Sequence, residues 1–216
     1  ELAMMRRNVV LLGLLSPHHK EGIDALAQHG VTAFAMEKLP RISRAQNMDV
    51  LSSQANIAGY KAVIMAANVY QRFFPMLMTA AGTVKAARVL ILGAGVAGLQ
   101  AIATAKRLGA VVEAFDVRPA AKEQVESLGA KFVEVPLSDE EKAKAETAGG
   151  YATEMSDDYK RRQGELMHER AIAADIIITT ALIPGRPAPV LIKEETVRAM
   201  RPGSVIVDMA VEAGGN

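Results

Sequence analysis

The chain has 216 residues, which is long for one small domain and short for two full ones, so we expect one large α/β domain or one domain with part of another. Half of the residues are hydrophobic and 23% are charged, a composition that excludes an intrinsically disordered chain. The balance of 25 basic and 24 acidic residues gives no reason to expect a nucleic-acid partner, and the absence of cysteine excludes disulfides, thiolate metal ligands and thiol nucleophiles.

The first forty residues predict a β-α-β unit. Residues 9–15 are typical of a short buried strand, residues 20–29 of a helix that Gly30 ends, and residues 31–36 of a second strand. Because the chain begins with Glu1 and ends just after a strand-like segment, we expect a fragment of a longer polypeptide. No apolar stretch reaches the roughly 18 to 20 residues that span a bilayer, so we expect no direct membrane insertion by this fragment.

Two connecting segments follow this unit. Residues 48–70 carry small apolar side chains at helical spacing and predict a long helix that links two lobes. Residues 73–79 predict an apolar turn or a short helix.

A second set of strands predicts a parallel sheet. Strand-like segments, with helical patterns between most of them, lie at residues 89–92, 111–115, 131–135, 176–180 and 205–208. This alternation predicts the α/β class, with a Rossmann-type doubly wound parallel sheet and part of a second α/β lobe. We expect three parts: the C-terminal part of the first lobe at 1–47, a linking helix and connection at 48–85, and a C-terminally truncated Rossmann domain at 86–216.

One stretch of the chain is too long for an ordinary crossover. Charged and small residues occupy positions 136 to 161, where a strand-to-helix connection needs only a few residues. The stretch is therefore either functional or disordered, and a helix at residues 159–173 follows it.

A glycine-rich turn carries the clearest chemical signal. After the strand at residues 89–92 come Gly93, Ala94, Gly95, Val96, Ala97 and Gly98. The run opens a helix and is followed by a second strand that ends in Asp116, about 20 residues on, as the dinucleotide fingerprint requires. Gly93 would permit the tight turn, Gly95 the approach of a pyrophosphate, and Gly98 the close packing of helix on sheet.

The residue type at position 116 decides the expected cofactor. A carboxylate there would accept hydrogen bonds from both hydroxyls of the adenosine ribose and would repel a 2′-phosphate, so the sequence predicts NAD(H). Arg118 is placed to hold a phosphate and leaves NADP(H) open as the lesser alternative. The other interpretation is that these glycines only shape a strand-to-helix turn.

A polar hinge precedes the long helix. Its polar side chains are Arg41, Ser43, Arg44, Gln46, Asp49 and Ser52. One interpretation is helix capping, with Asn47 at the N-cap and Asp49 in the first turn. The other is that an amide, an acid, a hydroxyl and a guanidinium near a dinucleotide site orient the carboxamide of a nicotinamide.

Several long segments together resemble one family. They are PRISRAQNMDVLSSQANIAGYKAV, MTAAGTVKAARVLILGAGVAGLQAIATAKRLGAVVEAFDVRPAAKEQVESLGA, ETAGGYATEM, TTALIPGRPAPVLI and VIVDMAVEAGGN. From about residue 11 to residue 216 the chain resembles the NAD(H)-binding domain I of the proton-translocating NAD(P) transhydrogenases, which lies in their alpha subunit. Relative to that domain, the beginning of the first lobe and everything after Asn216 are missing.

The resemblance implies a set of partners. In that family domain I holds NADH, domain III holds NADP(H), and a membrane domain II couples hydride transfer to proton translocation. The resemblance also implies a homodimer of domain I, located peripherally at the cytoplasmic or mitochondrial matrix face of the energy-transducing membrane. Hydride transfer between two nicotinamides needs no nucleophile and no metal, so we expect no metal site and assign no role to His18, His19 or His168.

The resemblance also implies roles for particular residues. Around the nicotinamide it places Arg41, Gln46, Asp49 and Ser52, with Gln46 facing the nucleotide of domain III. Around the rest of the nucleotide it places Gly95 and Val96 at the pyrophosphate, Asp116, Val117 and Arg118 at the adenosine ribose, and Leu182 at the adenine. It places Gly150 and Tyr151 in the mobile loop of the family, within the overlong stretch, and Gln163 on the far side of that loop.

Two other functions remain open from the sequence. Alanine dehydrogenase has a related fold and fingerprint, and would need a lysine and a histidine in the first lobe, most of which this chain lacks. The hinge and the ETAGGYATEM loop favour transhydrogenase over it. A non-catalytic NAD-binding module would bind nucleotide without transferring hydride.

Overall fold

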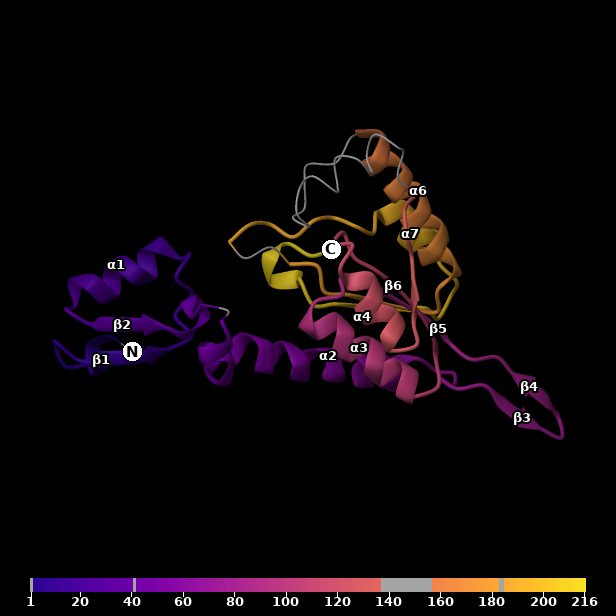
Figure 1. Cartoon of the computed structure of the whole chain (residues 1–216), viewed down its shortest axis with the longest axis horizontal. Helices are drawn as coiled ribbons and strands as arrows, with labels where there is room; N and C mark the ends of the chain where they lie inside the picture. Colours follow the sequence, from indigo (N-terminus) through magenta and orange to yellow (C-terminus); the bar gives the residue numbers. More distant parts are fainter. Residues whose placement is uncertain (1, 41, 137–156, 183–184) are drawn as a thin grey trace. The chain divides into compact units, whose positions relative to one another are not determined.

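The computed structural model describes residues 2–40, 42–136, 157–182 and 185–216. The chain divides into two compact units, Glu1–Ala55 and Asn56–Asn216, which we call the first and second units (Figure 1). The long helix α2 (Val50–Val69) contains the point of division. The expected linking segment at residues 48–85 stays a prediction.

The first unit contains the predicted β-α-β arrangement. Strand β1 (Val10–Gly13) pairs in parallel with β2 (Thr32–Ala35), and α1 (Lys20–Gln28) connects them. Gly30, at φ +76°, ends the helix segment as the sequence predicts, because glycine adopts this left-handed conformation without steric cost. Three short 3₁₀ helices complete the unit: η1 (Leu2–Met4), η2 (Met36–Lys38) and η3 (Ser43–Met48).

The segment between the long helix and the second sheet is a hairpin. Strands β3 (Leu77–Thr79) and β4 (Gly82–Val84) pair antiparallel, so the expected apolar turn or short helix at residues 73–79 is wrong. Gly82, at φ +133°, permits the reversal, and the Thr79 hydroxyl donates to the Gly82 carbonyl at 3.3 Å while accepting from the Ala81 amide. The turn therefore lies just beyond the segment whose pattern suggests a helix.

The second unit is built on a five-stranded, all-parallel sheet. Its spatial order is β7-β6-β5-β8-β9, where the strands are β5 (Arg88–Leu92), β6 (Val111–Phe115), β7 (Lys131–Phe132), β8 (Ile176–Thr179) and β9 (Val205–Asp208). From the central β5 the chain builds outward in one direction and later returns to build in the other, which is the doubly wound topology that the sequence predicts. The strand expected at residues 131–135 is shorter than predicted, and Pro136 follows it closely.

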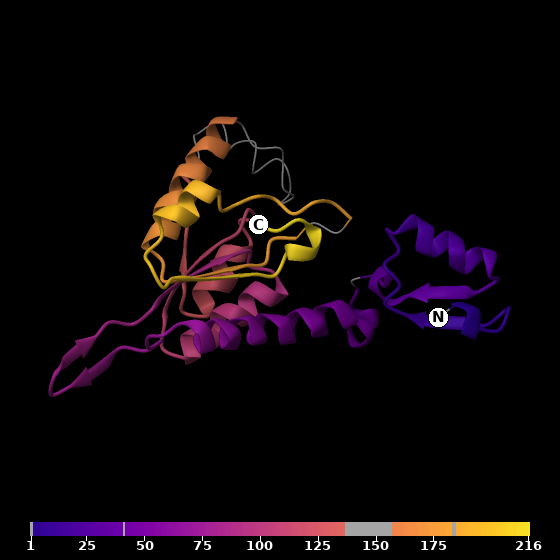
Figure 2. The same cartoon turned by 180° about the vertical axis from the view of Figure 1, so that it is seen from behind.

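Helices cover both faces of this sheet, as Figures 1 and 2 show from opposite sides. The helices are α3 (Val96–Arg107), α4 (Ala121–Ser127), α6 (Asp157–Ala173), α7 (Glu194–Ala199) and the 3₁₀ helix η4 (Val211–Ala213). Alternate residues of β5 point to opposite faces: Ile91 packs in the core with α2, α3 and α4, and Leu90 packs in the core with α6. Burial on both faces explains why the central strands are uninterrupted apolar runs.

Helix α2 approaches the start of α3 very closely within the second unit. A Cβ atom on Gly59 would lie 2.1 Å from the carbonyl oxygen of Ala97, in the first turn of α3. Because backbone cannot yield as a flexible side chain can, only glycine fits at this crossing. The small-residue face of α2 that the sequence shows is thus required by contact with the helix that follows the glycine turn.

This crossing generates a stability prediction with a matched control. We expect Gly59→Ala to lower the free energy of unfolding by about 1–3 kcal/mol, because the added methyl overpacks the α2–α3 contact. In α6, a Cβ on Gly164 meets nothing within 4 Å, so Gly164→Ala should raise the free energy of unfolding by about 0.5–1 kcal/mol. Urea denaturation measures both. Equal effects of the two variants would contradict the close approach.

Candidate functional site

The glycine turn lies at the carboxyl end of the central strand β5. Gly93 has φ +100°, and its amide donates to the Phe115 carbonyl at 2.8 Å, which links the turn to the end of β6. A Cβ on Gly98 would lie 1.8 Å from the Gly93 carbonyl oxygen, so α3 folds back directly over the turn. These two glycines perform the tight-turn and close-packing roles that the fingerprint predicts for them.

The space next to Gly95 is open. A Cβ placed on Gly95, the N-cap residue of α3, would meet nothing within 4 Å. The first backbone amides of a helix have no partner inside the helix and lie at the positive end of its dipole. The turn therefore leaves room for an anion of pyrophosphate size beside these amides, and the residues fit a dinucleotide.

The carboxylate of Asp116 lies against this turn. Its Oδ2 accepts a hydrogen bond from the Ala94 amide at 2.7 Å, and its side chain is only 7% exposed. Asp116 follows the last residue of β6, so the strand brings the acid to the turn across a sequence separation of 22 residues. The structure thereby places the acid and the glycine run of the fingerprint in one site.

Arg118 pairs with the same carboxylate. Its Nε lies 2.9 Å from Oδ1 and its Nη2 lies 3.0 Å from Oδ2 of Asp116, while its backbone amide donates to Oδ1 at 2.8 Å. Burial, the largest single influence, raises the pKa of Asp116, but the hydrogen bonds from Arg118 and Ala94 and the charge of Arg118 together lower it below its ordinary value. Asp116 is therefore ionised at neutral pH.

Thr180 is a member of this site that sequence reasoning missed. Its hydroxyl donates to the Gly93 carbonyl at 3.0 Å, and its amide donates to the Leu92 carbonyl at 2.8 Å, so the end of β8 supports the turn from the other side. Its position at the carboxyl end of a strand next to the switch point is the signal that could have identified it.

The apolar residues predicted at the site are exposed. Val96, Val117 and Leu182 are 41%, 50% and 54% exposed, in the second unit, just beyond β5, β6 and β8. Exposed apolar side chains that follow the strands on both sides of a switch point are suited to cover a flat ring. Gln163 lies on α6 and is partly buried. Gly150 and Tyr151 lie outside the described residues.

The hinge residues belong to the first unit. The Asp49 carboxylate accepts from the Ser52 amide at 2.9 Å and from the Ser52 hydroxyl at 2.7 Å, immediately before α2 begins at Val50. Asp49 is thus the N-cap, and the expected N-cap at Asn47 is wrong because the 3₁₀ helix η3 contains Asn47. Gln46 is exposed on η3, and Arg41 lies outside the described residues.

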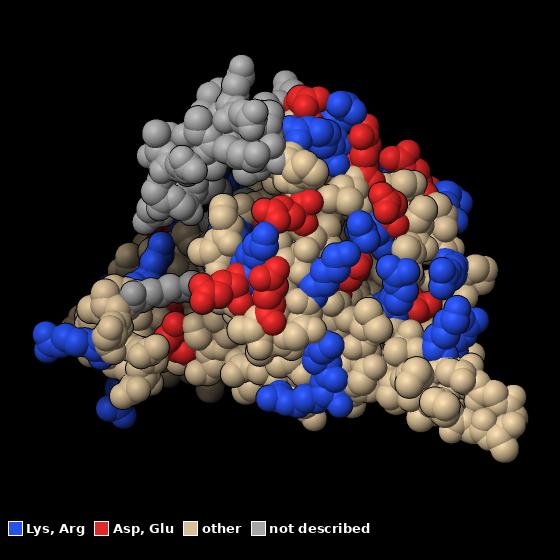
Figure 3. All heavy atoms as spheres, turned by 45° about the vertical axis from the view of Figure 1, so that its right-hand side comes forward, with Lys and Arg blue, Asp and Glu red and all other residues tan. Residues whose placement is uncertain are grey.

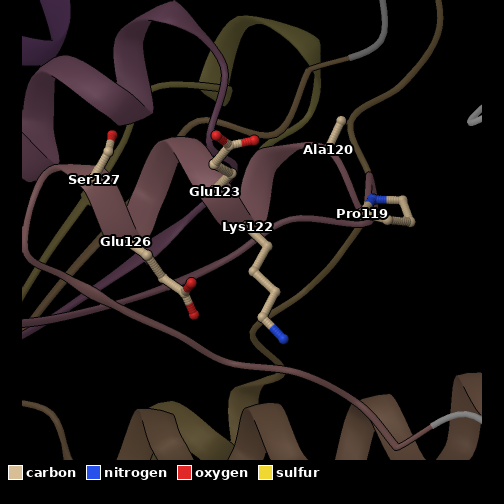
Figure 4. A pocket seen from close by; sticks show the side chains of 6 residues that line it. All are labelled: Pro119, Ala120, Lys122, Glu123, Glu126 and Ser127. Carbon is tan, nitrogen blue, oxygen red and sulfur yellow. The ribbon is translucent and has the colours of Figure 1, made fainter.

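The surface offers no rival site with converging groups among the described residues. Basic and acidic side chains are interspersed on the face in Figure 3, in agreement with the balanced charge. One hollow is lined by Pro119 and Ala120 and by side chains of α4, where Lys122, Glu123 and Glu126 do not converge on a point (Figure 4). Lys122 instead pairs with Glu134 at 2.7 Å.

Two further searches concern metals and membranes. Within the described ranges, no three side chains of His, Cys, Asp or Glu gather closely enough to hold a metal ion. In the same stretches of the chain, no helix combines the length and apolarity needed to cross a bilayer.

The geometry first defines a class, a Rossmann-like α/β domain with an acid at its glycine turn. Family models narrow this further: "Alanine dehydrogenase/PNT, C-terminal domain" matches residues 62–216, and "Alanine dehydrogenase/PNT, N-terminal domain" matches residues 1–58. The chain therefore belongs to the alanine dehydrogenase/PNT family, and the resemblance seen in the sequence is confirmed.

Individual relatives favour the transhydrogenase branch. The chain is 60% identical to an NAD(P) transhydrogenase subunit alpha of Rhodospirillum rubrum, across 100% of this chain and 56% of the relative. The transhydrogenase structure from Sinorhizobium meliloti matches at 55% identity with a TM-score of 0.87, covering 100% of this chain and 57% of that one. The alanine dehydrogenase of Bacillus subtilis is 29% identical over 100% of this chain and 51% of its own length. The chain thus spans little more than half the length of these relatives.

The lowered pKa of Asp116 generates a pH prediction. At neutral pH we expect Asp116→Asn to lower the free energy of unfolding by about 1–3 kcal/mol, because charge-assisted hydrogen bonds to Arg118 and Ala94 are weakened. A carboxyl with a depressed folded pKa stabilises the fold above its unfolded pKa, so the difference should begin to shrink below about pH 4 and vanish once the pH falls below the folded pKa. Urea titrations across this range measure it, and a difference independent of pH would be the contrary result.

Proposed function

We propose that this chain is the NAD(H)-binding portion of a proton-translocating NAD(P) transhydrogenase, and that Asp116 binds the adenosine ribose. The observation that carries the proposal is the ionised carboxylate of Asp116 held against the glycine turn by the Ala94 amide. The high identity to transhydrogenase alpha subunits across the whole chain supports the particular enzyme.

The position of Asp116 explains the choice between the two nicotinamide cofactors. A carboxylate accepts hydrogen bonds from the 2′- and 3′-hydroxyls of a ribose, and it repels a 2′-phosphate at the same place. The open space at Gly95 accommodates the pyrophosphate, and the exposed Val96, Val117 and Leu182 cover the adenosine end. NAD(H) fits this arrangement better than NADP(H).

The hinge at the start of α2 has the second role. Arg41, Gln46, Asp49 and Ser52 orient the nicotinamide ring, and Gln46 faces the nucleotide of the partner domain. The mutual hydrogen bonds of Asp49 and Ser52 hold these two side chains in a fixed arrangement next to the exposed Gln46. Gly150, Tyr151 and Gln163 belong to the loop and helix that complete the site.

The reaction depends on position rather than on acid–base groups of this chain. When bound, NADH supplies a hydride from C4 of its nicotinamide, which NADP⁺ on domain III accepts. The residues of this chain bind the nucleotide and hold its ring at the transfer distance, and such positioning can lower a barrier by roughly 7 to 11 kcal/mol at best. A lysine and histidine pair for a keto acid is not required.

The partners follow from the same proposal. The NADP(H)-binding domain III and the membrane domain II of the enzyme complete its activity, which couples hydride transfer to proton translocation. The chain is attached peripherally through domain II at the cytoplasmic or matrix face of the membrane, and two copies of domain I form a homodimer. Sedimentation equilibrium of the chain tests the dimer.

The ribose assignment predicts a change of cofactor preference. We expect Asp116→Ala to weaken NADH binding and to remove the discrimination against NADPH, because the charge that repels the 2′-phosphate is lost while Arg118 remains. Titration of NADH and NADPH, followed by their fluorescence, gives both dissociation constants. An unchanged preference for NADH would place the ribose elsewhere.

The nicotinamide assignment predicts a kinetic effect. In a mixture of the complete domain with an NADP-bearing domain III, Gln46→Asn should slow hydride transfer at least several-fold, because a shorter amide misplaces the ring, while NADH binding stays nearly intact. Gln54→Asn is the matched control, because Gln54 is also exposed and lies on α2. If Gln46→Asn abolishes NADH binding, or if both variants slow transfer equally, the role of Gln46 is wrong.

A further inference from the structure

The hydrogen-bonding capacity of the Asp116 carboxylate is fully used in the structure. Four donors reach it: the amides of Ala94 and Arg118, and the Nε and Nη2 atoms of the Arg118 side chain. A carboxylate offers about four acceptor positions, two on each oxygen. Each oxygen of Asp116 here accepts one backbone donor and one guanidinium donor, so neither has a position left for a ribose hydroxyl.

The four donors differ in how easily they can leave. The Ala94 amide belongs to the glycine turn, and the Arg118 amide belongs to the tight loop that follows β6, so both are fixed by the backbone. The Arg118 side chain is 50% exposed, whereas the side chain of Asp116 is 7% exposed. The guanidinium can therefore swing into solvent without disturbing the fold.

The guanidinium and a ribose diol have the same hydrogen-bonding pattern. Nε donates to Oδ1 and Nη2 donates to Oδ2, so one planar group gives one donor to each oxygen. The 2′- and 3′-hydroxyls of a ribose also offer one donor to each oxygen of a carboxylate. Exchange of one group for the other preserves the number of hydrogen bonds on Asp116.

We propose that the guanidinium of Arg118 occupies the place of the ribose diol on Asp116 in the nucleotide-free protein, and that the adenosine ribose binds by displacing it. Arg118 is then an internal competitor of the ribose rather than a ligand of a 2′-phosphate. This inference rests on the proposed NAD(H) site. It assigns to Arg118 a role in setting the affinity for the diol, separate from the role of Asp116 in accepting it.

The test compares a nucleotide that carries the diol with one that lacks it. The probes are ADP and 2′,3′-dideoxyADP, whose dissociation constants are measured by calorimetry on the unmodified chain and on Arg118→Ala. The ratio of the two constants isolates the contribution of the diol, because any loss of attraction between Arg118 and the phosphates affects both probes equally. We expect Arg118→Ala to raise the advantage of ADP over the dideoxy analogue roughly fivefold, the scale of a partly exposed ion pair.

Two further variants and one spectrum sharpen the test. Arg198→Ala removes an arginine that pairs through Nε and Nη2 with Glu194, outside the glycine turn, and should leave the ratio unchanged. Arg118→Lys, with a single point donor, should give an intermediate ratio. In the unmodified chain, the NMR signal of the Arg118 Nε–H should shift on addition of ADP and stay in place with the dideoxy analogue, which requires no variant to fold.

The outcomes separate this inference from the proposed function. If the unmodified chain binds neither NADH nor ADP, the NAD(H) site itself is refuted, and the role of Arg118 is refuted with it. If it binds both, but Arg118→Ala leaves the diol advantage unchanged or lowers it, the site stands and Arg118 does not compete with the ribose. Folding of the variant is expected, because Asp116 keeps its two backbone donors.

Discussion

The hydrogen bond from the Ala94 amide to the Asp116 carboxylate joins the two halves of the candidate site. It connects the turn after β5 to the end of β6, two strands that pair in parallel and in register along their full length. The Gly93 amide makes a second link to Phe115, and Thr180 holds the same turn from β8. The position of the acid relative to the phosphate-sized space is therefore fixed by three neighbouring strands rather than by a flexible side chain.

Close backbone packing behind the turn serves the same purpose. Gly98 lets α3 fold back over Gly93, and Gly59 lets α2 reach the first turn of α3. A methyl group at either position would push the amides of that first turn away from where an anion would bind. The glycines of the fingerprint and the small residues of α2 thus act together, although they lie about 40 residues apart in the chain. In this account the scaffold orients a nucleotide, and the chemistry belongs to the nucleotide.

Much of this arrangement could be predicted from local patterns. The apolar strands, the glycine run and the acid at the end of β6 follow from short-range signals, and the family resemblance of the whole chain is confirmed by the family models. The hairpin β3–β4 was missed because its pairing depends on a turn at Gly82, beyond the apolar segment that suggests a helix. The cap at Asp49 was misassigned because a 3₁₀ helix ends there. The pairing of Arg118 with Asp116 depends on a rotamer that no sequence pattern specifies.

The central claim is that Asp116 accepts the two hydroxyls of the adenosine ribose of NADH. A crystal structure of the chain with NADH tests it most directly. The account predicts that the 2′- and 3′-hydroxyls lie within hydrogen-bonding distance of the two carboxylate oxygens of Asp116, with the pyrophosphate beside Gly95. A ribose bound away from Asp116, or a pyrophosphate outside the glycine turn, would contradict it.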